Sequence, residues 1–145
     1  AILRAQRTGS AMALMFLDID AFKTINDTLG HASGDSVLAE YANRLRSSVR
    51  ATDTVARLAG DEFVVVLENL PARDAAAAVA QKILAQIRAP AFRLDSQRLQ
   101  VTTSIGIAFR QGGDAPVTAE ELLAHADSAL YAAKSAGRNR FEFSD

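Results

Sequence analysis

The sequence contains no cysteine, and only three of its 145 residues are proline. The lack of cysteine excludes disulfides and thiolate metal sites. The apolar runs are far too short to span a bilayer, and no signal peptide is visible. The formal net charge of −1 gives no bulk electrostatic attraction to nucleic acid or to a membrane. The remainder, 49% apolar and 23% charged, is typical of one globular domain with a hydrophobic core.

Two acidic residues stand at the tip of a predicted hairpin. Asp61 and Glu62 follow the small pair 59–60 and precede the apolar run Phe63–Leu67. This run is short and rich in β-branched residues, so it predicts a strand that is buried on both faces. The segment Thr54–Leu58 predicts the partner strand, which places residues 59–61 at the turn. Carboxylates at the mouth of a buried strand pair are costly unless they meet a cation.

The rest of the pattern predicts a sheet with helices packed on it. In chain order it predicts the end of a helix over 1–8, a buried strand over 12–17, a helical turn over 21–29, a loop over 30–35, a helix over 37–49, a helix over 73–88, strands over 91–94 and 99–109 with a bulge or bend at Gly106, a helix from the capping box Thr118–Glu121 to about Ala136, and a short strand over 141–143. This order predicts an α+β fold with a ferredoxin-like core.

A second acidic strand end points to a metal. The strand over 12–17 ends in Asp18-Ile19-Asp20, and it would neighbour the strand that follows Asp61. Carboxylates of Asp18 and Asp61, with the carbonyl of Ile19, could hold one or two Mg²⁺ ions together with substrate phosphates. Such a pair could activate a hydroxyl and neutralise a leaving pyrophosphate. The alternative is that these acids are ordinary turn and cap residues.

Candidate phosphate ligands lie far from these acids in sequence. There is no Walker A motif. Lys134 falls in the last turn of a predicted helix, and Arg138 follows the helix stop at Gly137, so both could reach one anion. The alternative is that these cations only stabilise the helix macrodipole. Lys23 and the backbone around Phe22 are further candidates.

Two polar residues could recognise a base. Asn26 and Asp35 flank the predicted loop at Gly30. A carboxylate accepts from N1–H and the exocyclic amine of guanine, and an amide can meet the remaining edge. Adenine lacks those donors and would leave a buried carboxylate unpaired. The alternative is that both residues serve a turn and a helix N-cap.

Five motifs together carry a family resemblance. They are Asp18-Ile-Asp-x-Phe-Lys-x-Ile-Asn-Asp27, Gly30-His-x-x-Gly-Asp35, Arg57-Leu-Ala-Gly-Asp-Glu-Phe63, Ser104-Ile-Gly106 and Ala133-Lys-x-x-Gly-Arg-Asn139. In this order and spacing the chain resembles a GGDEF domain of the diguanylate cyclase family over nearly its whole length. The family's customary opening motif is missing. We therefore expect residues 1–145 to be a single trimmed domain from a longer multidomain signalling protein, which is cytoplasmic or the cytoplasmic part of a membrane-attached protein.

The resemblance implies an activity and a set of roles. Two GTP molecules, one on each protomer of an antiparallel homodimer, would condense to cyclic di-GMP and two pyrophosphates with Mg²⁺ or Mn²⁺, without nucleic acid or membrane contact. The implied metal ligands are Asp18, Asp61 and the Ile19 carbonyl, with Glu62 as a further catalytic acid for metal support or proton handling. The implied substrate-binding residues are Phe22, Lys23, Asn26, Asp35, Gly60, Lys134 and Arg138.

The resemblance also implies an inhibitory product site. Arg50-x-x-Asp53 stands where many members bind cyclic di-GMP, so that Arg50 would stack on guanine or pair with phosphate and Asp53 would accept from a guanine edge. Lys82 stands where a secondary arginine often occurs. Taken without the resemblance, an arginine ending a helix and an aspartate opening a turn need no ligand.

The chain departs from the family signature at Ala59, where the first glycine is expected. If φ is positive there, alanine costs roughly 1–2 kcal/mol. If the backbone instead approaches the nucleotide closely, the methyl group would crowd it. We expect a functioning cyclase of reduced rate. The alternative is a regulatory module that binds GTP or cyclic di-GMP without turnover.

Overall fold

The structure is a computed structural model that describes residues 10–95 and 97–144. Its elements are β1 (Ala11–Ile19), α2 (Phe22–Leu29), α3 (His31–Ser48), β2 (Thr54–Ala59), β3 (Glu62–Leu70), α4 (Arg73–Arg88), β4 (Phe92–Leu94), β5 (Gln97–Leu99), β6 (Thr103–Arg110), α5 (Ala119–Ser135) and β7 (Phe141–Phe143). The helix end predicted over 1–8 lies outside the described residues. No described helix has the length and apolar character that crossing a membrane requires.

A five-stranded sheet forms the centre of the molecule, with the strand order β2-β3-β1-β6-β7. Neighbouring strands are antiparallel except for β6 and β7, which are parallel. Four strands of the sheet and two helices form a βαββαβ unit, which consists of β1, α3, β2, β3, α4 and β6 in chain order. The order of these strands in the sheet is β2-β3-β1-β6. This is the ferredoxin-like arrangement. The predicted fold class is therefore confirmed.

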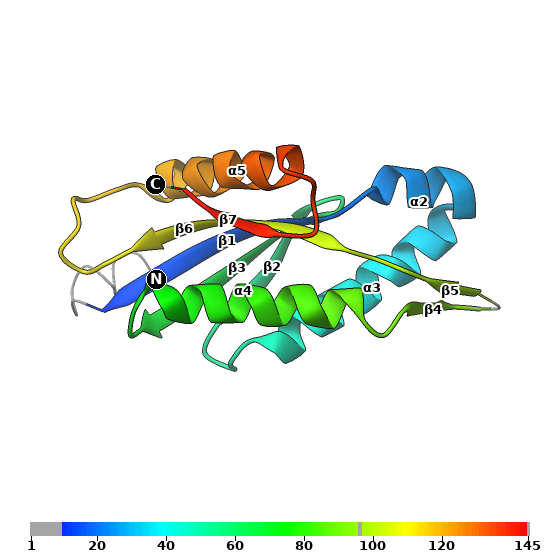
Figure 1. Ribbon diagram of the computed structural model, residues 1–145, viewed down its shortest axis with the longest axis horizontal. Coiled ribbons are helices and arrows are strands. Elements are labelled where there is room, and N and C mark those ends of the chain that lie inside the picture. Colours follow the sequence, from blue (N-terminus) through cyan, green and yellow to red (C-terminus); the bar gives the residue numbers. More distant parts are fainter. Residues whose placement is uncertain (1–9, 96, 145) are drawn as a thin grey trace.

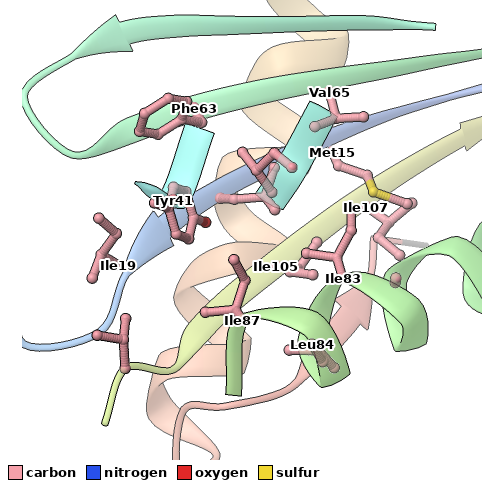
Figure 2. Close-up of a cluster of buried hydrophobic side chains, with 14 of the residues drawn as sticks. Met15, Ile19, Tyr41, Phe63, Val65, Ile83, Leu84, Ile87, Ile105 and Ile107 are labelled. Carbon is pink, nitrogen blue, oxygen red and sulfur yellow. The ribbon is translucent and has the colours of Figure 1, made fainter. Parts of the chain in front are cut away.

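The two faces of the sheet are covered unequally. Helices α3 and α4 lie on one face and α5 lies on the other (Figure 1). The larger core packs strand residues such as Met15 and Ile107 against Ile83 of α4 (Figure 2), whereas the smaller core packs Phe16 against Leu130 of α5. Successive strand residues point to opposite faces, so β1 contributes to both cores. This double burial fixes the position of its acidic end.

Gly106 forms neither the bulge nor the bend that the sequence suggested. It continues β6 in regular register opposite Phe16 of β1. A Cβ atom at this position would lie 2.1 Å from the carbonyl oxygen of Ala126 and 2.2 Å from the amide nitrogen of Leu130. Glycine is therefore needed because α5 packs its backbone directly against the strand.

The predicted long strand over 99–109 is also wrong. Residues 97–99 pair with β4 in a separate two-stranded sheet, which projects beyond the central sheet (Figure 1). Pairing with β1 begins only at Thr103, opposite Ile19. Before that point the carbonyl of Thr102 accepts a hydrogen bond of 3.0 Å from the amide of Asp20. The continuous apolar pattern thus spans two strands with different partners.

The capping box that the sequence predicts for α5 is confirmed. The Thr118 hydroxyl accepts from the amide of Glu121, and the Glu121 carboxylate accepts from the amide of Thr118, each at 3.0 Å. At the other end Gly137 has φ 123°, which suits the residue after a helix. Together these signals fix where the last turn of α5 lies, and that turn carries Lys134.

Candidate active site

The acidic ends of β1 and β3 lie side by side. Asp18 of β1 pairs in register with Glu62 of β3, and the β2–β3 turn brings Asp61 near enough to influence the charge of Asp18. From the last turn of α5, the ammonium group of Lys134 forms a salt bridge with Oδ2 of Asp18. We call Asp18, Asp61, Glu62 and Lys134 the acidic corner. It lies at the end of the sheet from which the chain continues into α2 (Figure 1).

Asp18 is only 6% exposed. Its Oδ2 atom faces Lys134, but its buried Oδ1 atom has no hydrogen-bond partner among the described residues. Burial raises the pKa of Asp18 to about 6, with smaller increases from Asp61 and Asp20, although Lys134 opposes the change. A buried oxygen of a carboxylate without a partner is energetically costly. Oδ1 of Asp18 is therefore the atom of the acidic corner that a bound ligand would stabilise.

The donor set of the acidic corner fits a hard cation. Carboxylate oxygens suit Mg²⁺, which usually takes one or two protein carboxylates and keeps its remaining positions for water and phosphate. Across residues 10–95 and 97–144, no three histidine, cysteine or acidic side chains converge to form a complete metal cage. A cation at Oδ1 of Asp18 would therefore need oxygen ligands from the backbone or from a substrate.

The β2–β3 turn is shorter than the sequence suggested. Ala59 belongs to β2 and pairs with Glu62, so only Gly60 and Asp61 form the turn. Gly60 has φ 50°, whereas Ala59 does not have positive φ. The side chain of Arg57 holds this turn by donating from Nε to the Gly60 carbonyl at 2.7 Å. Alanine at 59 therefore causes no left-handed strain, and close approach of a nucleotide is the remaining reason for a glycine there.

Asp35 lies inside a helix and not in the predicted loop. Gly30, at φ 91°, ends α2 and is followed at once by α3, which begins at His31. Asp35 is thus one turn into α3, where it lines a groove of about 480 Å³, a size typical of ligand pockets. The groove extends to Arg57 and so reaches the turn of the acidic corner. Its lining residues are Asp35, Leu38, Ala39, Ala42, Arg46, Val55, Arg57 and Phe63.

Gly34 explains how Asn26 comes close to α3. A Cβ atom at position 34 would lie 1.8 Å from Oδ1 of Asn26 and 3.4 Å from the ring of Phe22. The absence of a side chain at 34 therefore admits the Asn26 amide next to the turn of α3 that carries Asp35. Four of the candidate substrate ligands, Lys23, Asp35, Gly60 and Arg138, are exposed, so the carboxylate of Asp35 is not buried, contrary to the expectation for base recognition.

The predicted product-binding residues also meet one another. Arg50 donates from Nη2 to Oδ1 of Asp53 at 2.9 Å and from Nε to Oδ2 at 3.0 Å, and it also donates to the carbonyl of Glu68. Burial alone would raise the pKa of Asp53, but the hydrogen bonds from Arg50 and from the Glu68 amide outweigh it, so the pKa is lowered. Arg50, Asp53 and Lys82 line one cavity of about 390 Å³.

Sequence reasoning missed the polar residues that support the acidic corner. The Thr103 hydroxyl donates to the carbonyl of Asp18 at 2.5 Å, and it lies 2.6 Å from the hydroxyl of the fully buried Tyr41. Because Thr103 has one proton to donate, the hydrogen of this second bond comes from Tyr41. Asp20 is buried as well and is held by three donors. The one sequence signal for a buried Asp20 was its position two residues after Asp18 at the end of a buried strand.

Comparison with known proteins places the chain in a family. The model of the diguanylate cyclase GGDEF domain matches residues 1–140. The chain belongs to the GGDEF family. It is 43% identical over 143 residues to the bifunctional diguanylate cyclase/cyclic di-GMP phosphodiesterase MucR of Pseudomonas aeruginosa. The aligned region covers 99% of this chain and 20% of MucR.

Solved GGDEF domains have the same fold. The GGDEF domain of TpbB from Pseudomonas aeruginosa superposes with a TM-score of 0.93 at 40% identity, over 100% of this chain and 83% of that one. The GGDEF domain of DgcB from Caulobacter crescentus, solved in complex with c-di-GMP, gives 0.88 at 31% identity, over 98% of this chain and 82% of that one. Since the chain spans a fifth of MucR, it corresponds there to one part of a much longer protein.

Proposed function

We propose that this GGDEF domain is a diguanylate cyclase that condenses two GTP molecules into cyclic di-GMP with release of two pyrophosphates. In each of two steps, the 3′-hydroxyl of one GTP attacks the α-phosphate of the other, and pyrophosphate leaves with the broken phosphoanhydride bond. The observation that carries the proposal is the buried Asp18, which lies beside Glu62 and the ammonium of Lys134 and whose Oδ1 atom has no hydrogen-bond partner within residues 10–95 and 97–144.

The acidic corner supplies the groups that this chemistry needs. Asp18, Asp61 and the Ile19 carbonyl would hold Mg²⁺ or Mn²⁺, and the cation would neutralise the charge that develops on the phosphates. Glu62 is available either to support the cation or to accept the proton of the 3′-hydroxyl. Lys134 is already at the corner, and Arg138 follows one turn later in the sequence. A triphosphate beside Asp18 would lie within reach of Lys134.

The groove beside α3 would hold the base. Asp35 would accept from N1–H and the exocyclic amine of guanine, and Asn26 would meet the remaining polar edge. Arg57 lines the groove and also holds Gly60, so a nucleotide with its base near Asp35 could extend its phosphates toward the turn. Phe22, Lys23 and Gly60 are the further proposed substrate contacts.

Catalysis would require two copies of the chain. Each protomer has one acidic corner and one groove at Asp35, whereas the product contains two guanosines. Two protomers facing each other in antiparallel fashion would bring the 3′-hydroxyl of each GTP to the α-phosphate of the other. We further propose that cyclic di-GMP inhibits the enzyme by binding at Arg50, Asp53 and Lys82, which line one cavity. The similar GGDEF domain of DgcB has been solved in complex with c-di-GMP.

A second candidate function is favoured by Ala59. If its methyl group obstructs the nucleotide, the domain would bind GTP or cyclic di-GMP as a signal without turnover. Reverting Ala59→Gly should then raise the rate of product formation sharply. Because the backbone at this position is not left-handed, an increase would report relief of crowding and not relief of backbone strain.

The decisive experiment is chromatographic analysis of the purified chain after incubation at high concentration with GTP and Mg²⁺. Asp61→Ala removes a proposed ligand, and Asp127→Asn is the matched control, since Asp127 is an exposed acid on α5. We expect cyclic di-GMP from the parent and from Asp127→Asn, and none from Asp61→Ala. If no product forms even when a fused coiled coil enforces dimerisation, while nucleotide still binds, the cyclase proposal fails and the regulatory module is favoured.

A further inference from the structure

Asp20 is an acid that the proposed chemistry does not use. It lies directly after β1 and is 9% exposed. Oδ1 accepts from the Ser104 hydroxyl at 2.6 Å, and Oδ2 accepts from the Thr102 hydroxyl at 2.7 Å and from the Asn139 amide at 3.1 Å. Both oxygens are thus occupied by protein donors, unlike Oδ1 of Asp18. This leaves Asp20 poorly suited to serve as a metal ligand.

The donors to Asp20 come from segments that are far apart in the sequence. Thr102 directly precedes β6 and Ser104 is its second residue, 82 and 84 residues away, and Asn139 follows α5, 119 residues away. The Asp20 carboxylate therefore joins the ends of β1 and β6 to the segment that leaves α5. Hydrogen bonds to an ionised carboxylate are stronger than those between neutral groups.

The segment that Asp20 holds has an unfavourable backbone conformation. After Gly137 at φ 123°, Arg138 has φ 64° and Asn139 has φ 51°. Asparagine tolerates the left-handed region, but arginine rarely adopts it. Two hydrogen bonds close the end of α5 here, from the amide of Arg138 to the carbonyl of Ala133 at 3.0 Å and from the amide of Gly137 to that of Lys134 at 3.3 Å. Beyond them, the Asn139 amide depends on Asp20.

We propose that Asp20 is a positioning residue that fixes the segment carrying Lys134 and Arg138 relative to Asp18, and thereby sets the affinity for the outer phosphates of GTP. The inference rests on the proposed function, because it takes these two cations as phosphate ligands. Asp18 lies in β1 and Asp20 directly follows it, so a hydrogen bond from Asn139 to Asp20 ties the segment of both cations to the strand that carries the proposed metal ligand.

The test compares GTP with GMP, which share the base but differ in the outer phosphates. Calorimetric titration in EDTA gives the ratio of the two dissociation constants, which we expect to favour GTP in the parent. In Asp20→Ala we expect that preference to fall about tenfold, with GMP affinity nearly unchanged. Ser104→Ala is the matched control, since it removes one hydrogen bond from the same carboxylate but leaves the contact with Asn139. It should keep the preference of the parent.

The direction of the change separates the clamp from a charge effect. Removing a negative charge close to the phosphates would by itself raise the affinity for the more negative nucleotide, whereas loss of the clamp lowers it. Asp20→Asn keeps the shape of the side chain and makes the test decisive if Asp20→Ala does not fold. We expect a smaller fall of about threefold, because a neutral amide oxygen accepts more weakly than a carboxylate.

Three outcomes would overturn the inference. A preference for GTP that survives in both Asp20 variants overturns the clamp alone. An equal loss in Ser104→Ala and in the Asp20 variants would mean that the site is distorted as a whole and that positioning by Asp20 is not the cause. A parent protein with no preference for GTP over GMP in EDTA would overturn the premise that Lys134 and Arg138 bind the outer phosphates, and with it this inference. The proposed cyclase depends on the cation and is tested separately by product formation with Mg²⁺.

Discussion

Two aspartates of this domain each face a cation, and the structure leaves them in opposite states. Asp53 is met by the side chain and amide of Arg50 and by the amide of Glu68, and its pKa is lowered. In the part of the chain that the structure describes, Asp18 is met by Lys134 on one oxygen only, and burial raises its pKa to about 6. A carboxylate therefore meets a cation at both sites. We call Asp53 closed, because both of its oxygens accept hydrogen bonds, and Asp18 open, because one of its oxygens accepts none from the described residues.

The two aspartates would respond differently to a ligand. A cation at Asp18 would meet Oδ1, which accepts no hydrogen bond from the described residues, and would stabilise the charge that burial disfavours. A ligand at Arg50 must instead replace hydrogen bonds that the domain already makes within itself. We infer that binding at the acidic corner relieves a cost already present in the fold, whereas binding at the Arg50 site exchanges one set of contacts for another.

The largest effect should come from neutralising Asp18. In Asp18→Asn we expect cyclase activity to fall about a thousandfold or more, because a neutral amide is a poor ligand for a hard cation that supplies several kcal/mol to the transition state. Initial rates of cyclic di-GMP formation measure this, with Asp127→Asn as the control. If Asp18→Asn retains most of the parent activity, Asp18 is not a metal ligand.

The stability of the metal-free protein should change with pH in a direction set by Asp18. The folded state binds the Asp18 proton more tightly than the unfolded chain, whose value is near 3.8. Stability from this group is therefore present below about pH 4 and lost as pH rises through 6. With a shift to about 6, we expect the parent to lose roughly 2 kcal/mol relative to Asp18→Asn between pH 4 and 7. Urea unfolding in EDTA measures this difference.

Asp53 should behave with the opposite sign. Since its pKa is lowered in the folded state, its stabilising contribution is present above about pH 4 and lost as pH falls below that value. The same unfolding experiment with Asp53→Asn should therefore show the advantage of the parent disappearing at acid pH. Matching pH profiles for the two variants would contradict the contrast between the closed and the open aspartate.

Much of this arrangement could be predicted from the sequence. Short, nearly uninterrupted apolar runs predicted β1 and β3, and the helical spacing of apolar residues predicted α4. The acidic ends of two predicted neighbouring strands placed Asp18 near the hairpin tip at Asp61, and the structure brings these two ends together. The register itself does not follow from the pattern, because β1 is buried on both faces, and a slip of one residue would not exchange an apolar face for a polar one. The pairing of Asp18 with Glu62 is therefore a finding of the structure.

Other features depended on tertiary contacts that no local pattern contains. The loop predicted over 30–35 was wrong because Gly34 was taken as a loop residue, whereas it sits in α3 to admit Asn26. The predicted strand over 99–109 was wrong because its two halves pair with different strands. The hydrogen bond from the Asn139 amide to Asp20 joins residues that are 119 positions apart in the sequence. Each of these features required knowing what packs against the segment.

The smallest effects should come from removing the two cations. Arg50→Ala leaves the buried Asp53 with only backbone donors, and Asp53 remains charged at neutral pH, so we expect a loss of about 2 kcal/mol. Lys134→Ala should cost under about 1 kcal/mol at pH 6, because Asp18 can take up a proton when its cation is gone. Urea unfolding at pH 6 compares the two variants. Equal losses would mean that Asp18 is as strongly held as Asp53, and the open state of the acidic corner would then have no energetic basis.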